Sequence, residues 1–180
     1  MFGPSRAAAV LFSLVFGMAQ RNPERPVQLS VLDRLIDTEP ANRQEVPLTR
    51  AQSVRALKAA LRRDLEWLLN SRRCIQQPEA ADGVTLELTE SVYNFGLPDF
   101  TSLSLNSGKD RQRLTRMIED AVALFEPRLQ GVRVTPQGSE RHRSLRFIIE
   151  GMLQIEPSPE LVTFDTFVQV GSGEVRVQGE

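Results

Sequence analysis

The sequence predicts an α+β fold, with N-terminal helices packed on a C-terminal antiparallel β-meander of three to four strands. Apolar residues recur at helical spacing along the first two-thirds of the chain, as far as Pro127. Beyond this residue they alternate with polar residues, which is typical of strands that bury one face. Helices followed by a run of strands define this fold class. The 180 residues suffice for one domain with a substantial core.

Three helices are expected before the strands, and each begins near a side chain that can cap its first turn. The first lies within residues 29–37, where apolar side chains share one face. The second, residues 49–70, opens on a capping box formed by Thr49 and Gln52. The third, residues 107–126, has the most regular apolar spacing in the chain, and a proline ends it.

The region after the third helix is expected to form the meander, because its alternating segments are separated by glycine, serine and proline. The expected strands cover residues 128–135, 144–155, 161–170 and 174–178, with a turn at 136–140 after the first. Earlier in the chain, residues 84–88 also alternate. They predict either a short strand or a segment that runs into a helical turn near Val92.

Charge and rare residues argue against several classes of site. With 22 basic and 23 acidic residues, the net charge is −1, without the basic excess of a nucleic-acid-binding protein. The single cysteine, Cys74, excludes an internal disulfide and a cysteine-based metal cage, and it fits a reducing compartment. The single histidine, His142, lies in a polar turn and supports neither a catalytic triad nor a zinc site. No metal and no cofactor is expected.

Residues 1–28 form an N-terminal extension made of an apolar run and a polar linker. The apolar run, residues 7–19, has 13 residues, too few to span a bilayer. It fits two interpretations: a secretion signal that is later removed, or a helix that docks on another surface. The docking face would carry Leu11, Leu14, Val15 and Met18. Prolines interrupt the linker, residues 20–28.

Glu126 occupies the position that most needs an explanation. It follows the last expected helix, at an end where the helix dipole disfavours a negative charge. One interpretation is the general acid of a glycosidase, with Asp99 or Asp165 as the second carboxylate. The other is a structural ion pair with a guanidinium group, from the nearby Arg128 or from a partner chain. We expect the second: a rigid corner at Pro127 that directs Glu126 and Arg128 outward to partner chains.

Several stretches, taken in order, resemble one protein family. They are SVLDRLID, ESVYNFGLPDF, IEDAVALFEPRL, SLRFIIEGML and VTFDTFVQVGSGEVRV, and they lie within residues 29–178. In this order they are similar to the gene-25-like baseplate wedge family of contractile tailed phages, and above all to its TssE branch in bacterial type VI secretion systems. Residues 1–28 are not part of the shared pattern. The resemblance thus defines residues 29–180 as the baseplate wedge domain.

This resemblance implies a structural role without catalysis. Such subunits sit in baseplate wedges with TssF, TssG and TssK. Their C-terminal strands resemble a sheath protomer and so offer an edge on which the TssB–TssC sheath starts to polymerise. The implied location is cytoplasmic, at the baseplate docked on the inner membrane, with contact to the membrane complex through the assembly. A removed secretion signal would defeat that role, so the docking helix becomes the preferred interpretation of residues 7–19. Because members were also labelled lysozyme-like, the alternative is a peptidoglycan hydrolase that uses Glu126.

The resemblance also implies which residues bind partners. Its Glu-Pro-Arg motif falls on Glu126, Pro127 and Arg128, and its Gly-Leu-Pro-Asp segment falls on Gly96, Leu97, Pro98 and Asp99. A short last strand with an unpaired edge would provide the sheath contact by strand addition. The residues expected at this edge are Phe164, Asp165, Val168, Val175 and Val177. The chain is expected to remain folded without residues 174–180.

Overall fold

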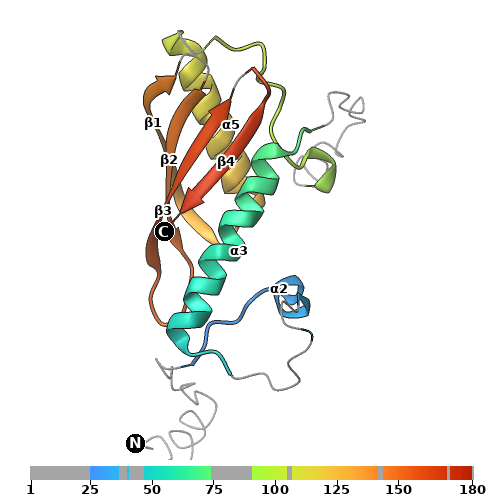
Figure 1. The fold of residues 1–180 in the computed structure, drawn as a ribbon, viewed down its shortest axis with the longest axis vertical. Coiled ribbons are helices and arrows are strands. Elements are labelled where there is room, and N and C mark those ends of the chain that lie inside the picture. Colours follow the sequence, from blue (N-terminus) through green and yellow to red (C-terminus); the bar gives the residue numbers. More distant parts are fainter. Residues whose placement is uncertain are drawn as a thin grey trace, which may run out of the picture.

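A four-stranded antiparallel sheet occupies the C-terminal part of the chain, and its strands lie in sequence order (Figure 1). The strands are β1 (Leu129–Arg141), β2 (Ser144–Leu153), β3 (Glu160–Gln169) and β4 (Glu174–Gly179). Each strand pairs with the next along the chain. The computed structural model describes residues 25–36, 40, 47–73, 91–104, 107–141, 144–169 and 171–179.

Two long helices, α3 (Arg50–Asn70) and α5 (Gly108–Phe125), pack on one face of this sheet. Both begin at the expected caps. Thr49 and Gln52 form the capping box of α3, and the Ser107 side chain accepts from the first turn of α5. Two short elements are also present: α2 (Val31–Leu35) and the 3-10 turn η1 (Val92–Asn94).

The core lies between the sheet and the two long helices. Along β2 buried and more exposed side chains alternate, so that one face of the strand is turned toward the helices. The helices contribute buried stripes at i, i+3 and i+4 spacing. Fully buried members include Leu61, Leu65 and Leu69 of α3, Leu114, Ile118 and Val122 of α5, Phe147 and Ile149 of β2, and Val168 of β3. The predicted α+β fold is confirmed.

β1 is longer than predicted, because it continues through the turn expected at residues 136–140. Its register with β2 runs without a break on both sides of Pro136. The Val134 N–H is directed away from β2, since it donates to Glu119 of α5. The nitrogen of Pro136, two residues on, therefore faces the same way. A proline is tolerated there because an outward nitrogen of an edge strand needs no partner in the ladder.

β4 belongs to the core although it is the last strand of the chain. The side chains of Val175 and Val177 face the helices, and each residue is 1% exposed. Removing them would take two packed residues from the core, at a cost of several kcal/mol in the free energy of unfolding. This burial contradicts the expectation that the chain remains folded without residues 174–180.

Some sequence predictions fall outside the described residues. These are the docking face with Leu11, Leu14, Val15 and Met18, the alternating segment 84–88, Cys74 and His142. The helical turn expected near Val92 is present as η1. In the part of the chain that the structure describes, no helix combines the length and the apolar character needed to cross a membrane.

The hydroxyl group of Thr166 provides a test of this packing. Thr166 lies on the helix-facing side of β3 with no exposed surface, and no described group bonds its Oγ1. We expect Thr166→Val to raise the free energy of unfolding by about 1 kcal/mol, because it removes an unpaired buried hydroxyl. Urea unfolding measures this, with Thr163→Val on the exposed face of β3 as control. A destabilised Thr166→Val variant would contradict the assigned packing.

Candidate partner-binding site

The corner between α5 and β1 is built around Glu126, the residue that caps the helix. Its N–H donates to the Val122 carbonyl at 2.9 Å, and its own carbonyl accepts from the Leu129 N–H at 3.0 Å. Pro127 comes next and prevents the helix from continuing. Glu126 is only 5% exposed. Its carboxylate therefore requires a partner within the folded chain.

Arg128 is that partner. Its Nε and Nη2 donate to the two carboxylate oxygens of Glu126 at 2.6 and 2.5 Å, which makes a bidentate pair. The hydrogen bond to Glu126 raises the pKa of Arg128 against the opposing effect of burial, and Asp64 raises it further. The prediction that Glu126 and Arg128 point outward to separate partner chains is wrong for the described chain. The corner at Pro127 places the two side chains against each other instead.

This pair continues into a series of alternating charges that joins three elements. Arg128 Nη2 also donates to Asp64 Oδ2 of α3 at 2.7 Å. The other oxygen of Asp64 accepts from Arg63 Nε at 3.0 Å and from Arg63 Nη2 at 2.7 Å. Arg63 Nη2 in turn donates to Asp33 Oδ1 of α2 at 2.7 Å. We call Asp33, Arg63, Asp64, Glu126 and Arg128 the charge chain, which links α2, α3 and the α5–β1 corner.

The members of the charge chain stabilise one another in their ionised forms. Burial opposes ionisation of Asp33, but the Ser30 hydroxyl and the Arg63 guanidinium hold its pKa below the ordinary value. The contribution of Asp33 to stability is therefore present at neutral pH and is lost as the pH falls through its lowered pKa. Hydrogen bonds to Asp64, and then to Asp33, raise the pKa of Arg63. Three carboxylates against two guanidinium groups leave one net negative charge.

An apolar groove lies beside the charge chain. Its volume is about 470 Å³, and its walls come from α2, α3, the residue after η1 and the α5–β1 corner. The apolar side chains that line it are Leu32, Trp67, Leu68, Phe95, Phe125 and Pro127. Ser30, Asp64, Glu126 and Arg128 complete the lining. The charge chain thus fixes the relative position of the elements that form the groove.

Aromatic contacts order the walls of this groove. Phe95 and Phe125 meet edge to face, with ring centroids 5.3 Å apart. The Arg63 guanidinium lies over the Trp67 ring at 5.2 Å from its centroid. Trp67 nevertheless remains 56% exposed. A large exposed indole that is held in place by a charged neighbour is suited to contact another protein.

The geometry favours binding over proton transfer. Both oxygens of Glu126 accept from Arg128, so neither is directed toward a substrate. The aspartates considered as its catalytic companions are engaged elsewhere. Asp99 accepts from the N–H and hydroxyl of Thr101 at 2.9 and 2.8 Å, and Asp165 pairs across the sheet with β2. These contacts give the candidate carboxylates structural partners rather than a shared catalytic centre.

The Gly96–Asp99 segment fastens the loop before α5 to the end of α3. Gly96 has φ +108°, and a Cβ at this position would lie 2.5 Å from the Ser71 carbonyl oxygen. The Leu97 N–H donates to the Ser71 carbonyl at 2.9 Å. The Leu97 carbonyl accepts from the Arg73 N–H at 3.1 Å. Gly96 and Leu97 are buried, so their contacts within the chain hold the loop in place. Partner binding by this segment stays a prediction.

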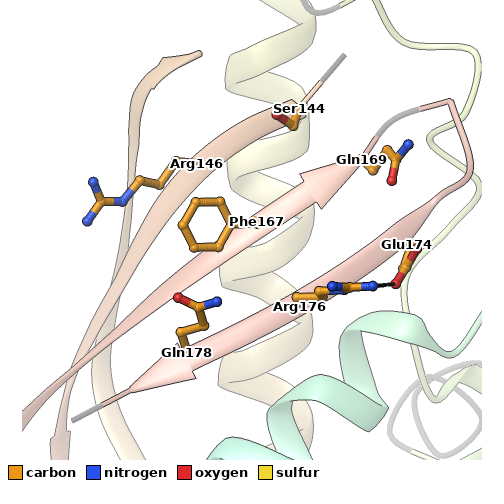
Figure 2. A pocket seen from close by; sticks show the side chains of 7 residues that line it. All are labelled: Ser144, Arg146, Phe167, Gln169, Glu174, Arg176 and Gln178. Atoms are coloured by element: carbon orange, nitrogen blue, oxygen red, sulfur yellow. Dashed lines mark hydrogen bonds and ion pairs between the residues drawn. The ribbon is translucent and has the colours of Figure 1, made fainter. Parts of the chain in front are cut away.

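The residues predicted at the sheath-contacting edge lie in β3 and β4. Phe164, Val168, Val175 and Val177 are at most 3% exposed and belong to the core, so their side chains are not accessible to a partner. The prediction that Phe164, Asp165 and Val168 lie at a free edge is wrong, because β3 is an inner strand that pairs with both β2 and β4. Val175 and Val177 do lie in the strand at the end of the sheet. Asp165 lies on the face of the sheet opposite α3 and α5, and it pairs with Arg146 at 2.7 Å. Figure 2 shows this face, where Phe167 and Arg176 also lie.

Sequence reasoning missed Asp33, Asp64 and Trp67 as site residues. Asp64 and Arg128 are 64 positions apart, and no local pattern predicts that they meet. One signal was available: Asp64 directly precedes Leu65 of the buried stripe, at the margin of the helix-packing face. A carboxylate at such a margin requires a cation or hydrogen-bond donors nearby.

The fold and the site together define an α+β domain whose candidate carboxylates are engaged in structural contacts. A family model described as baseplate wedge protein gp25 matches residues 55–158, more than half of the chain, and the protein belongs to this family. The match begins within α3 and extends past β2, so that it includes the motif at residues 126–128. No curated protein and no solved structure matches the chain significantly. Family membership confirms the resemblance and gives the protein a structural role in a baseplate.

Replacing Arg128 alone is expected to lower the free energy of unfolding more than replacing Arg128 and Glu126 together. Arg128→Ala leaves the buried Glu126 carboxylate without its guanidinium partner, so we expect the free energy of unfolding to fall by about 3 kcal/mol. Adding Glu126→Gln should recover roughly half of this loss, because no buried charge is then left unpaired. Urea unfolding of the wild type, both single variants and the double variant measures the effect. Equal losses in Arg128→Ala and in the double variant would contradict it.

Proposed function

We propose that this protein is a structural baseplate subunit of a type VI secretion system, a contractile injection machine. In this role it joins the wedge proteins TssF, TssG and TssK and nucleates the TssB–TssC sheath on its C-terminal strands. It acts at the cytoplasmic, inner-membrane-docked baseplate and reaches the membrane complex only through the assembly. The observation that carries the proposal is the apolar groove beside the charge chain, in a chain of the baseplate wedge family.

Three properties of the groove support a protein partner. It presents exposed apolar surface, with Trp67 at 56% and Leu32 at 52% exposure. Tryptophan is enriched among residues that dominate binding energy, and here its ring is held against Arg63 before any partner arrives. The net negative charge of the neighbouring charge chain suits a partner segment that carries a basic residue beside its apolar anchor.

The Glu-Pro-Arg residues contribute to this binding chiefly by fixing the shape of the groove. Glu126 and Arg128 hold each other and α3, and thereby keep the groove walls in position. All three residues also line the groove, and Pro127 contributes an apolar side chain to it. This role uses the buried carboxylate to fix geometry and requires no proton transfer, so the proposed function is not enzymatic.

Trp67→Ala tests the groove. We expect affinity for co-expressed TssF and TssG to fall at least about tenfold, because a central indole anchor is lost. The free energy of unfolding should change by less than about 1 kcal/mol, because the side chain is more than half exposed in the free subunit. Co-purification followed by titration measures binding. Leu161→Ala is the matched control, since Leu161 is an apolar residue, 62% exposed, on the face of β3 opposite α3 and α5.

Two outcomes would overturn this assignment. Unchanged binding by Trp67→Ala, together with weakened binding by Leu161→Ala, would move the wedge contact to the sheet. Peptidoglycan hydrolysis by the wild type that disappears in Glu126→Gln would establish the catalytic alternative. The expected result is that no hydrolysis is detected with either protein.

A further inference from the structure

Two polar side chains of α3 reach the main chain of β4. Asn70 Nδ2 donates to the Val175 carbonyl at 2.7 Å, and Asn70 Oδ1 accepts from the Val175 N–H at 2.9 Å. One turn earlier, Glu66 Oε2 accepts from the Val177 N–H at 3.2 Å. The Asn70 amide thus engages one donor and one acceptor of a single strand residue, as a neighbouring strand would. We call Glu66 and Asn70 the edge pair.

The groups that the edge pair occupies belong to the free side of β4. β4 is the last strand in the order of the sheet, and it pairs with β3 on its other side. Alternate residues of an edge strand direct their main-chain groups away from the ladder. At Val175 and Val177 these groups are directed to α3, which runs beside β4 in Figure 1. They are the groups through which another strand would be added to the sheet.

The opposite edge of the sheet is protected in a similar way. Glu119 of α5 accepts from the outward Val134 N–H of β1 at 2.8 Å. Pro136, two residues on, has no N–H to offer. At these positions both edge strands have their outward donors occupied or absent. This arrangement is typical of sheets that are protected against unintended strand addition.

We propose that the edge pair gates strand addition at β4: in the free subunit it occupies the strand-binding groups, and the sheath adds its strand only after the end of α3 moves away. The proposal rests on the proposed function, in which the sheath starts on these strands. It names Glu66 and Asn70 as residues that control when this contact forms. The partner that the opened edge fits is an extended segment with alternating main-chain donors and acceptors.

Release of the end of α3 frees the edge pair and also withdraws Leu68 and Leu69, which are 2% and 0% exposed. The incoming segment must therefore cover the apolar surface that these leucines leave. Asn70 is exposed and Glu66 is partly exposed, so their polar groups pass to water when they leave β4. The side chains of Val175 and Val177 stay packed in the core and keep β4 in the sheet. The incoming strand replaces each lost hydrogen bond with a main-chain one. Opening the edge therefore leaves no buried polar group without a partner.

Amide hydrogen exchange of the full chain tests the closed state. In Glu66→Ala/Asn70→Ala, the Val175 and Val177 amides should exchange at least about tenfold faster than in the wild type. The Arg176 amide, which faces β3, should stay protected and thereby show that β4 remains folded. Glu66→Gln keeps a hydrogen-bond acceptor at this position, so the Val177 amide should stay protected from exchange. Gln112→Ala is the control, because Gln112 is an exposed polar residue of α5. Wild-type Val175 and Val177 amides that exchange as fast as those of the double variant would overturn the proposal.

Sheath assembly in cells tests the gate itself. The double variant should start several-fold more fluorescent sheaths than the wild type, including sheaths detached from baseplates. Faster amide exchange with an unchanged or reduced number of sheaths would overturn the gating role. The proposed function has a separate test, because normal sheaths in cells that lack the entire chain would exclude sheath nucleation by this protein. In that case, the amide result would still show that the edge pair closes β4.

Discussion

The bidentate contact between Arg128 and Glu126 is the interaction on which the arrangement of the site depends. A carboxylate at a helix C-terminus, nearly removed from water, is unfavourable unless a cation lies within hydrogen-bonding distance. Arg128 supplies that cation, and its second carboxylate partner, Asp64, belongs to α3. Through Arg63 the same series reaches α2. The walls of the groove come from separate elements, and one continuous series of ion pairs holds these elements in position relative to one another.

α3 serves three purposes with three of its faces. Its leucine stripe packs into the core, Asp64 and Trp67 face the groove, and the edge pair closes β4. Because Glu66, Trp67 and Asn70 lie within about one turn, the groove and the sheet edge depend on the position of the same end of one helix. In the proposed role, this arrangement would keep the groove ordered and the sheet edge closed until a partner binds.

The parts of the structure that local chemistry determines could be predicted from sequence. The caps at Thr49 and Ser107 and the alternation along β2 follow from neighbouring residues, and they are confirmed. Pro136 was misleading, because a proline signals a turn unless the strand is known to be an edge. The pairing of Asp64 with Arg128 and of Asn70 with Val175 could not be predicted, since contacts 64 and 105 positions apart depend on tertiary packing. The sequence identifies the charge of Glu126 as an anomaly and offers Arg128 as one possible partner, but it does not show that the helix-to-strand corner turns the two side chains toward each other.

A double-mutant cycle between Asp64 and Arg128 tests the central claim most directly, because these two residues connect α3 to the α5–β1 corner. The cycle compares the unfolding free energies of the wild type, Asp64→Asn, Arg128→Gln and the double variant. Ion pairing across the corner predicts a coupling free energy of about 1–3 kcal/mol, with the two substitutions together costing less than the sum of each alone. A coupling free energy near zero would show that the two residues act independently and would contradict the role assigned to the charge chain.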